Sequence, residues 1–153
     1  NDARFRATVK IREGRRIMGD YVLKGEDVIE ERKFPDVIGK SAFPAGAVHV
    51  VGPGTLGTMK PPDVPKTGGS HDIPYRCLVP REVENLLVAG KAVSAYREAY
   101  QRFLMQTMVT GQAAGVAAAL CAKQNITPRM LESDISELQR ILVEQGAILT
   151  GTH

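Results

Sequence analysis

The stretch from Val48 to Gly57, VHVVGPGTLG, suggests nucleotide chemistry because its glycines follow the spacing G-x-G-x-x-G. That spacing holds a pyrophosphate when a buried strand leads into it and a helix follows it. Here Pro61, Pro62 and Pro65 follow the last glycine, and proline lacks an N–H and disfavours helix at the preceding residue. The sequence therefore predicts a Gly/Pro-rich surface loop that contacts no nucleotide phosphate.

Cys77 and Cys121 are the other residues whose type suggests chemistry. They are not in C-x-x-C spacing and do not lie near a histidine cluster in the sequence. We interpret them as reduced packing residues rather than as a disulfide or a metal site. No metal site is predicted, and the expected location is cytoplasmic.

The composition is that of one ordinary globular domain, with 153 residues, 43% hydrophobic and 24% charged, and a formal net charge of +3. The first residue is Asn1, and no segment resembles a signal peptide. We therefore expect a processed chain or a fragment of a longer protein.

Two segments could suggest a nucleic acid or a membrane as partner. Residues 2–16 carry six basic and two acidic residues, but apolar and polar types alternate over residues 5–12, which indicates a half-buried strand. Residues 103–122 are uncharged, but they include Gln106 and Thr110 and contain more Ala than Leu or Ile. We expect neither a nucleic acid nor a membrane as partner.

The chain divides into a β-rich segment, residues 1–72, and a C-terminal segment, residues 73–153. In the first segment we expect strands, one short helical turn within residues 24–31, and a Gly/Pro-rich connection over residues 52–72. The composition and the order of these elements favour an α/β or α+β fold.

The C-terminal segment has a more regular pattern. Residues 73–80 predict a short edge strand, because Pro74 and Pro80 exclude a central position. The apolar run from Leu86 to Gly90 is typical of a strand buried on both faces of a parallel sheet.

A long helix is predicted from Gln101 or Arg102 to Lys123. A stripe of small residues runs along it, and we expect this stripe to lie against another backbone because interior glycines destabilise a helix. The stripe consists of Gly111, Ala114, Gly115 and Ala118.

The last predicted elements are helices with no evident chemistry. Thr127 and Pro128 form a good N-terminus, and Asp134 with Glu137 forms a plausible capping box. Leu138, Ile141 and Leu142 supply the apolar face, and Gly146 is the expected stop.

Residues 73–122 resemble the C-terminal part of the FAD-dependent oxidoreductase family that includes fumarate-reductase-like flavoproteins. Three runs carry the resemblance: Ile73-Pro74-Tyr75-Arg76, Asn85-Leu86-Leu87-Val88-Ala89-Gly90 and Gly111-Gln112-Ala113-Ala114-Gly115. The runs VKIREGRRIMGDYVL and LQRILVEQGAIL extend it over nearly the whole chain.

The resemblance implies FAD as cofactor and a small-molecule substrate. It implies a partial flavin domain over residues 73–153, in which a returning strand precedes the long Gly/Ala-rich helix, and a substrate-side cap over residues 1–72. The strand-end residues Ala89, Gly90 and Lys91 would then lie beside the ribityl. Arg102, Phe103 and Leu104, at the helix start, would face the flavin pyrimidine, where N–H groups stabilise the reduced ring.

The same resemblance does not identify the residues that react with the substrate, and the catalytic residues stay unknown. The candidates for a proton donor or a carboxylate-orienting group are His71, Tyr75, Arg76, Arg97, Glu98 and Arg102. Arg97 and Glu98 could equally form an exposed ion pair with no role in the reaction.

Two hypotheses of function follow. In the first, the chain is the C-terminal section of an FAD-dependent oxidoreductase, and it requires the missing N-terminal flavin-domain section or self-associates. In the second, it is a non-catalytic α/β module whose Gly/Ala helix mediates oligomerisation.

Overall fold

A computed structural model describes residues 14–43, 69–99 and 104–151 of the chain. Five regular elements form its frame: α1 (Gly25–Ile29), β1 (Val37–Ser41), β2 (His71–Pro74), α2 (Leu104–Gln124) and α4 (Ser136–Glu144). A short helix, α3 (Pro128–Leu131), and the 3-10 turns η1 (Tyr75–Cys77), η2 (Gly90–Ala92) and η3 (Arg97–Ala99) connect them. The mixture of helices with a small sheet confirms the predicted α/β or α+β class.

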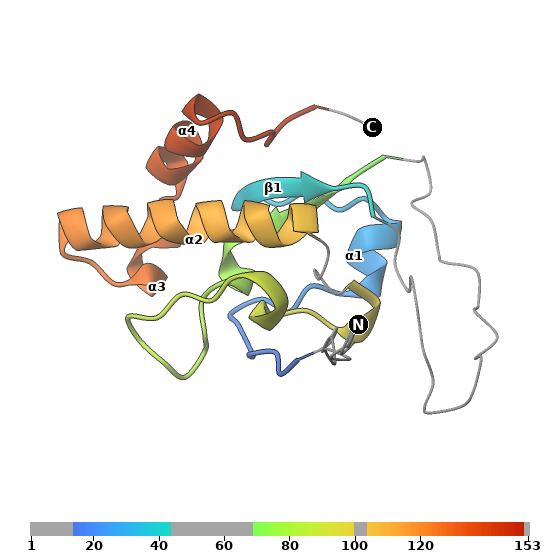
Figure 1. The fold of residues 1–153 in the computed structure, drawn as a ribbon, viewed down its shortest axis with the longest axis horizontal. Helices are drawn as coiled ribbons and strands as arrows, with labels where there is room; N and C mark the ends of the chain where they lie inside the picture. Colours follow the sequence, from blue (N-terminus) through green and yellow to red (C-terminus); the bar gives the residue numbers. More distant parts are fainter. Residues whose placement is uncertain (1–13, 44–68, 100–103, 152–153) are drawn as a thin grey trace, which may run out of the picture.

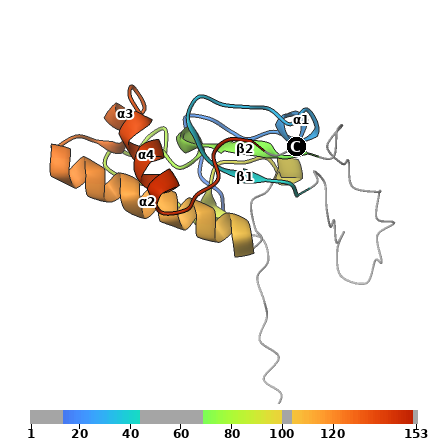
Figure 2. The same ribbon diagram turned by 90° about the horizontal axis from the view of Figure 1, so that it is seen from above.

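The small antiparallel sheet formed by β1 and β2 lies against α2 (Figures 1 and 2). The pairing has an irregularity between Val37 and Gly39. A Cβ atom at Gly39 would lie 2.2 Å from Cγ1 of Val109, so glycine is needed for β1 to approach the helix this closely. This contact fixes β1 beside the first half of α2.

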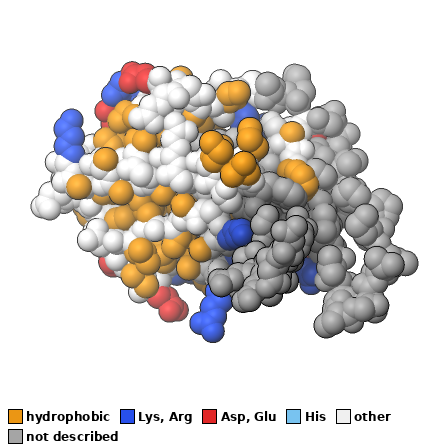
Figure 3. All heavy atoms as spheres, viewed as in Figure 1, with side chains coloured by type: hydrophobic (Ala, Val, Ile, Leu, Met, Phe, Trp, Pro, Cys, Tyr) orange, Lys and Arg blue, Asp and Glu red, His pale blue; other side chains and the backbone are white. Residues whose placement is uncertain are grey.

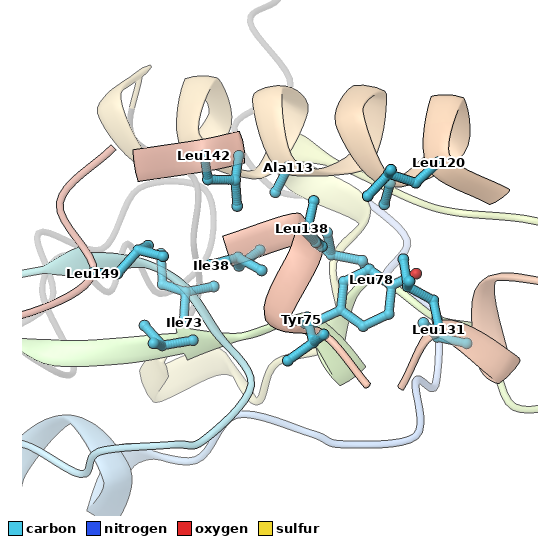
Figure 4. Packing of buried hydrophobic residues seen from close by; sticks show 14 of the residues in the cluster. Ile38, Ile73, Tyr75, Leu78, Ala113, Leu120, Leu131, Leu138, Leu142 and Leu149 are labelled. Atoms are coloured by element: carbon cyan, nitrogen blue, oxygen red, sulfur yellow. The ribbon is translucent and has the colours of Figure 1, made fainter. Parts of the chain in front are cut away.

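The hydrophobic core lies between α2, the sheet and α4 (Figure 4). Tyr75 is its largest fully buried side chain, and its hydroxyl donates a 3.1 Å hydrogen bond to the Pro128 carbonyl. Burial raises the pKa of Tyr75 above its usual range. Leu138 and Leu142 of α4 pack into the same core from the other side, as their spacing predicts.

The position of α2 in the sequence agrees with the prediction, but the orientation of its small residues does not. Gly111 and Gly115 are exposed, and a Cβ atom at either position would meet nothing within 4 Å. The residues that face the core instead lie on the opposite side of the helix, and they are Gln106, Thr110, Ala113, Ala117, Leu120 and Cys121. The expected backbone contact of the glycine stripe is therefore wrong within the described chain.

The apolar run at Leu86 does not form a strand. Residues 86–89 have no regular structure, Leu86 is 43% exposed, and Val88 N donates one 2.9 Å hydrogen bond to the Leu78 carbonyl. A parallel strand buried on both faces needs a neighbour on each side, and in the described part of the chain β1 and β2 pair only with each other.

The predicted helix starts and stops outside α2 are confirmed in some cases and wrong in one. The helical turn within residues 24–31 is confirmed as α1, and Thr127 accepts a 3.3 Å hydrogen bond from Met130 N, as expected of an N-cap. Gly146 ends α4 with a φ of +88°. The capping box is wrong, because Asp134 accepts from Ser136 N while Glu137 pairs with Arg140.

Two further predictions can be compared with the structure, and two others cannot. The edge strand predicted over residues 73–80 is wrong in its extent, because β2 spans only His71–Pro74 and the 3-10 turn η1 follows it. Cys77 and Cys121 are buried and free, as expected of packing residues. The predicted strand at residues 5–12 and the loop at residues 48–57 lie outside the described residues.

Candidate functional site

The turn at Gly90 is held against α2 by one side chain. Gly90 has a φ of +64°, a left-handed conformation that favours glycine. Its N–H donates a 3.0 Å hydrogen bond to Thr110 Oγ1, while that hydroxyl donates to the Gln106 carbonyl at 2.9 Å. Because Thr110 is fully buried, this pair of bonds fixes η2 beside the second turn of the helix.

A second polar contact fixes the start of α2 against the end of β1. Gln106 is 5% exposed, and its Nε2 donates a 2.8 Å hydrogen bond to Ser41 Oγ. The same oxygen accepts from Phe43 N at 3.2 Å. A buried amide without such a partner would be costly, so this bond sets how β1 meets the helix.

The end of β1 and the start of α2 line an open hollow of about 580 Å³. Its walls come from the end of β1 and from the first turn of the helix, and they are Lys40, Ser41, Ala42, Phe43, Leu104, Met105 and Gln106. Leu104 and Met105 are 73% and 74% exposed. Most of the wall is therefore apolar and open to a ligand.

The electrostatics of this end of the helix favour an electron-rich group. The N–H groups in the first turn of an α-helix lack carbonyl partners within the helix, and the helix dipole is positive there. The described first turn of α2 contains no acidic side chain. Lys40, whose side chain is 8% exposed, is held by Asp72 through a 2.7 Å ion pair.

The predicted flavin-side residues are only partly brought together. Leu104 lines the hollow, whereas Gly90, which Ala89 directly precedes, lies beside Thr107 and Thr110, roughly 5 to 9 Å further along the helix axis by helical rise. Lys91 is exposed on η2. Arg102 and Phe103 lie outside the described residues.

Two of the predicted reacting groups are buried structural residues. His71 is fully buried in β2, and desolvation lowers its pKa to about 4, so it is neutral at neutral pH. Tyr75 is fully buried in the core, where its hydroxyl donates a hydrogen bond to the Pro128 carbonyl.

The remaining candidates also have other roles or lie elsewhere. Arg76 forms a two-pronged ion pair with Asp36, at 2.9 and 3.1 Å, and lies over the Tyr21 ring. Arg97 and Glu98 are exposed on η3, which contacts α1. None of these side chains lines the hollow at the start of α2.

Sequence reasoning missed the side chains that build this site. Ser41, Gln106 and Thr110 were visible only as polar residues, two of them within a largely apolar helix that also carries other polar side chains. That contrast was the one available signal, since a polar residue facing a core needs a partner. Their partners lie 65 and 20 residues away in the chain, which no local pattern indicates.

Comparison with known proteins identifies the family. A family model described as FAD dependent oxidoreductase matches residues 3–142. No curated protein and no solved structure matched the chain. Since the matched range covers most of the 153 residues, the chain belongs to the FAD dependent oxidoreductase family.

Proposed function

We propose that this chain is the C-terminal section of an FAD-dependent oxidoreductase and that it binds the isoalloxazine and ribityl of FAD. The family implies FAD as cofactor. The observation that carries the proposal is the hollow at the start of α2, where apolar walls adjoin a helix N-terminus without acidic side chains.

The described residues fit the flavin ring. When bound, FAD supplies the acceptor or donor of a hydride. The N–H groups at the start of α2 would face the electron-rich pyrimidine edge, because the helix dipole stabilises negative charge there. Leu104 and Met105 would contact the ring, and Gln106 would keep the helix start in place through Ser41.

The turn at Ala89, Gly90 and Lys91 would run beside the ribityl. Thr110 is the positioning residue for this turn, since its hydroxyl holds the Gly90 N–H. Arg102 and Phe103 directly precede Leu104 in the sequence, and we propose that they belong to the same helix entry. We assign no catalytic acid or base.

The described residues offer less to the adenosine and pyrophosphate. In residues 14–43, 69–99 and 104–151, neither β1 nor β2 leads through a G-x-G-x-x-G turn into a helix, which is the unit that holds a dinucleotide pyrophosphate. Residues 1–72 would supply the substrate side, and another section would hold the pyrophosphate.

If this chain binds only the ring and ribityl of FAD, its affinities for FAD, riboflavin and ADP should differ in a specific way. The chain should bind FAD weakly, and riboflavin should bind within about threefold of FAD because both carry the same ring. ADP should not compete. Titrations followed by flavin fluorescence measure all three, and no turnover is expected. Tight stoichiometric FAD binding by a monomer, or competition by ADP, would contradict the proposed division.

A charge placed in the hollow provides the second test. Met105→Glu should weaken riboflavin binding by about tenfold, because an acidic side chain there occupies the position of the electron-rich edge. Ala119→Glu is the matched control, since Ala119 is exposed further along α2 and precedes Lys123 by one turn. Equal affinities for the two variants would place the flavin elsewhere.

A second candidate function, an oligomerisation module, rests on the outer face of α2. We define this face by its exposed residues Leu104, Met108, Gly111, Gly115, Ala118 and Ala122. Figure 3 shows hydrophobic side chains gathered over the side of the molecule where α2 lies. Self-association without any riboflavin binding would favour this candidate.

A further inference from the structure

The segment from Leu86 to Ala89 leaves one edge of its backbone without partners in the described chain. Val88 N donates a 2.9 Å hydrogen bond to the Leu78 carbonyl, and Ala89 has extended backbone, with φ −138° and ψ 170°. Successive residues of an extended segment direct their N–H and C=O groups to opposite edges. The backbone groups of Leu87 and Ala89 therefore point away from Leu78, and among the described residues they form no hydrogen bond.

A groove of about 530 Å³ lies between this segment and the second half of α2 (Figure 1). Leu87 forms one wall, and a Cβ atom at Gly115 on the opposite wall would meet nothing within 4 Å. None of the lining side chains is charged, and the lining consists of Asn85, Leu87, Ala114, Gly115, Ala118, Cys121, Ala122, Asn125, Ile126 and Pro128. The unpaired edge thus adjoins space for uncharged side chains of another strand.

An unpaired strand edge is a template for pairing with another chain, and here its length is limited. Asn85 and Gly90 have left-handed backbone, with φ of +55° and +64°, so the extended stretch ends at both of them. In an antiparallel copy, Leu87 could exchange two hydrogen bonds with Ala89 of its partner, and Ala89 two with the partner's Leu87. This register uses every unpaired group of the edge, whereas a register centred on Leu87 would leave Ala89 opposite Asn85.

The charges at the two ends of the segment also favour an antiparallel copy. Lys91 is the only charged residue in the sequence from position 86 to position 96. The turn before the segment gathers two arginines and three carboxylates, which are Arg81, Arg129, Asp20, Glu82 and Glu84. Antiparallel pairing brings the basic end of one copy to the acidic end of the other, whereas parallel pairing would bring like ends together.

We propose that two copies of this chain pair through residues 86–89 as antiparallel strands, with the twofold axis at Val88. Apolar side chains of the partner copy would enter the groove beside Leu87. A twofold axis is the commonest symmetry of soluble oligomers, and it requires a surface that is complementary to itself. The proposal gives the self-association of this chain a defined contact, and it does not depend on flavin binding.

The first experiment uses cysteine variants of the full chain in a glutathione redox buffer. Val88→Cys should form a disulfide-linked dimer, because directly opposed residues of such a pair lie about 4.5 Å apart at Cα. Leu86→Cys is the matched control, since it is exposed on the same face of the segment, yet the two copies of this residue would lie about 14 Å apart along the strands. The unchanged chain, whose Cys77 and Cys121 are buried, gives the background. Equal cross-linking of the two variants would overturn the proposal.

The second experiment measures amide hydrogen exchange in the unchanged chain by NMR. Exchange at Leu87 and Ala89 should slow by about threefold between about 30 µM and 600 µM chain, if half of the chain associates near 100 µM. Val88 is the internal control, because its N–H is already bonded to Leu78 within one copy. Exchange at Leu87 and Ala89 that does not depend on concentration would overturn the proposal.

Discussion

Glu132 and Asp20 bring two carboxyl groups together beside the guanidinium of Arg129. Arg129 pairs with Asp20 and Glu84 and also donates a 2.6 Å hydrogen bond to the Pro80 carbonyl. Desolvation, and then the charge and hydrogen bond of Asp20, raise the pKa of Glu132 to about 7, although Arg129 opposes the shift. The folded protein therefore holds a proton on Glu132 that the unfolded chain releases at a lower pH.

This shift predicts the sign of a pH dependence. Between the unfolded pKa of 4.5 and the folded pKa of about 7, the folded state binds more protons than the unfolded state, so the Glu132 contribution to stability falls as pH rises. Glu132→Gln should remove this loss. Solvent screening reduces the effect of a partly exposed group, and we expect a gain of about 1 kcal/mol at pH 8, or roughly 2–4 °C in melting midpoint.

The measurement compares melting midpoints of Glu132→Gln and the unchanged chain at pH 4 and pH 8. Taking the difference between the two proteins cancels the opposite contribution of His71, which is lost as pH falls through its own window. Glu82→Gln, at an exposed position, is the control. A difference that is the same at both pH values would exclude the raised pKa.

At the scale of elements, Gly115 in α2 and Gly19 in the segment before α1 differ in the space that surrounds them. Gly115 is exposed in the middle of α2 and has open space around its Cα. Gly19, by contrast, lies where a Cβ atom would be 2.8 Å from Ser94 Cβ and 2.9 Å from the Arg76 carbonyl oxygen. The space available for a Cβ atom, rather than the backbone φ, determines whether alanine is tolerated at each position.

Substitution by alanine therefore has opposite expected effects. Gly115→Ala should stabilise the chain by about 0.5–1 kcal/mol, because alanine is the better helix former. Gly19→Ala should destabilise it by about 1–3 kcal/mol through overpacking against backbone. Denaturant unfolding measures both, and a destabilising Gly115→Ala would indicate that this face is covered by another chain.

At the scale of the whole molecule, the outer face of α2 is an exposed apolar surface that includes Leu104 and Met108. By length and composition α2 could cross a membrane, but a core helix of a globular protein can have the same length and composition. Gln106 and Thr110 have partners within the chain. We therefore continue to expect a protein neighbour for this face.

The exposed face predicts self-association of the isolated chain. Met108 is 62% exposed on this face, and Met108→Lys should weaken association by about tenfold, because a charge would have to be buried. Met130→Lys is the control, since Met130 is 57% exposed on α3. Sedimentation velocity distinguishes the two, and a chain that stays monomeric at about 100 µM would contradict the prediction.

The sequence by itself determined the features that depend on neighbouring residues. The extent of α2, the turn that became α1, the Thr127 cap and the Gly146 stop were all readable, because the interactions that define them join residues within about four positions. The packing role of the two cysteines was also readable from their isolation in the sequence.

Tertiary structure decided which side of α2 is buried and what surrounds its start. The helix carries small apolar residues on both sides, such as Ala113 inward and Gly115 outward, so its periodicity has little contrast and cannot select a face. The contacts of Gln106 with Ser41 and of Lys40 with Asp72 join residues 65 and 32 positions apart. Only the folded chain brings such pairs within hydrogen-bonding distance, because no repeating pattern along the chain relates them.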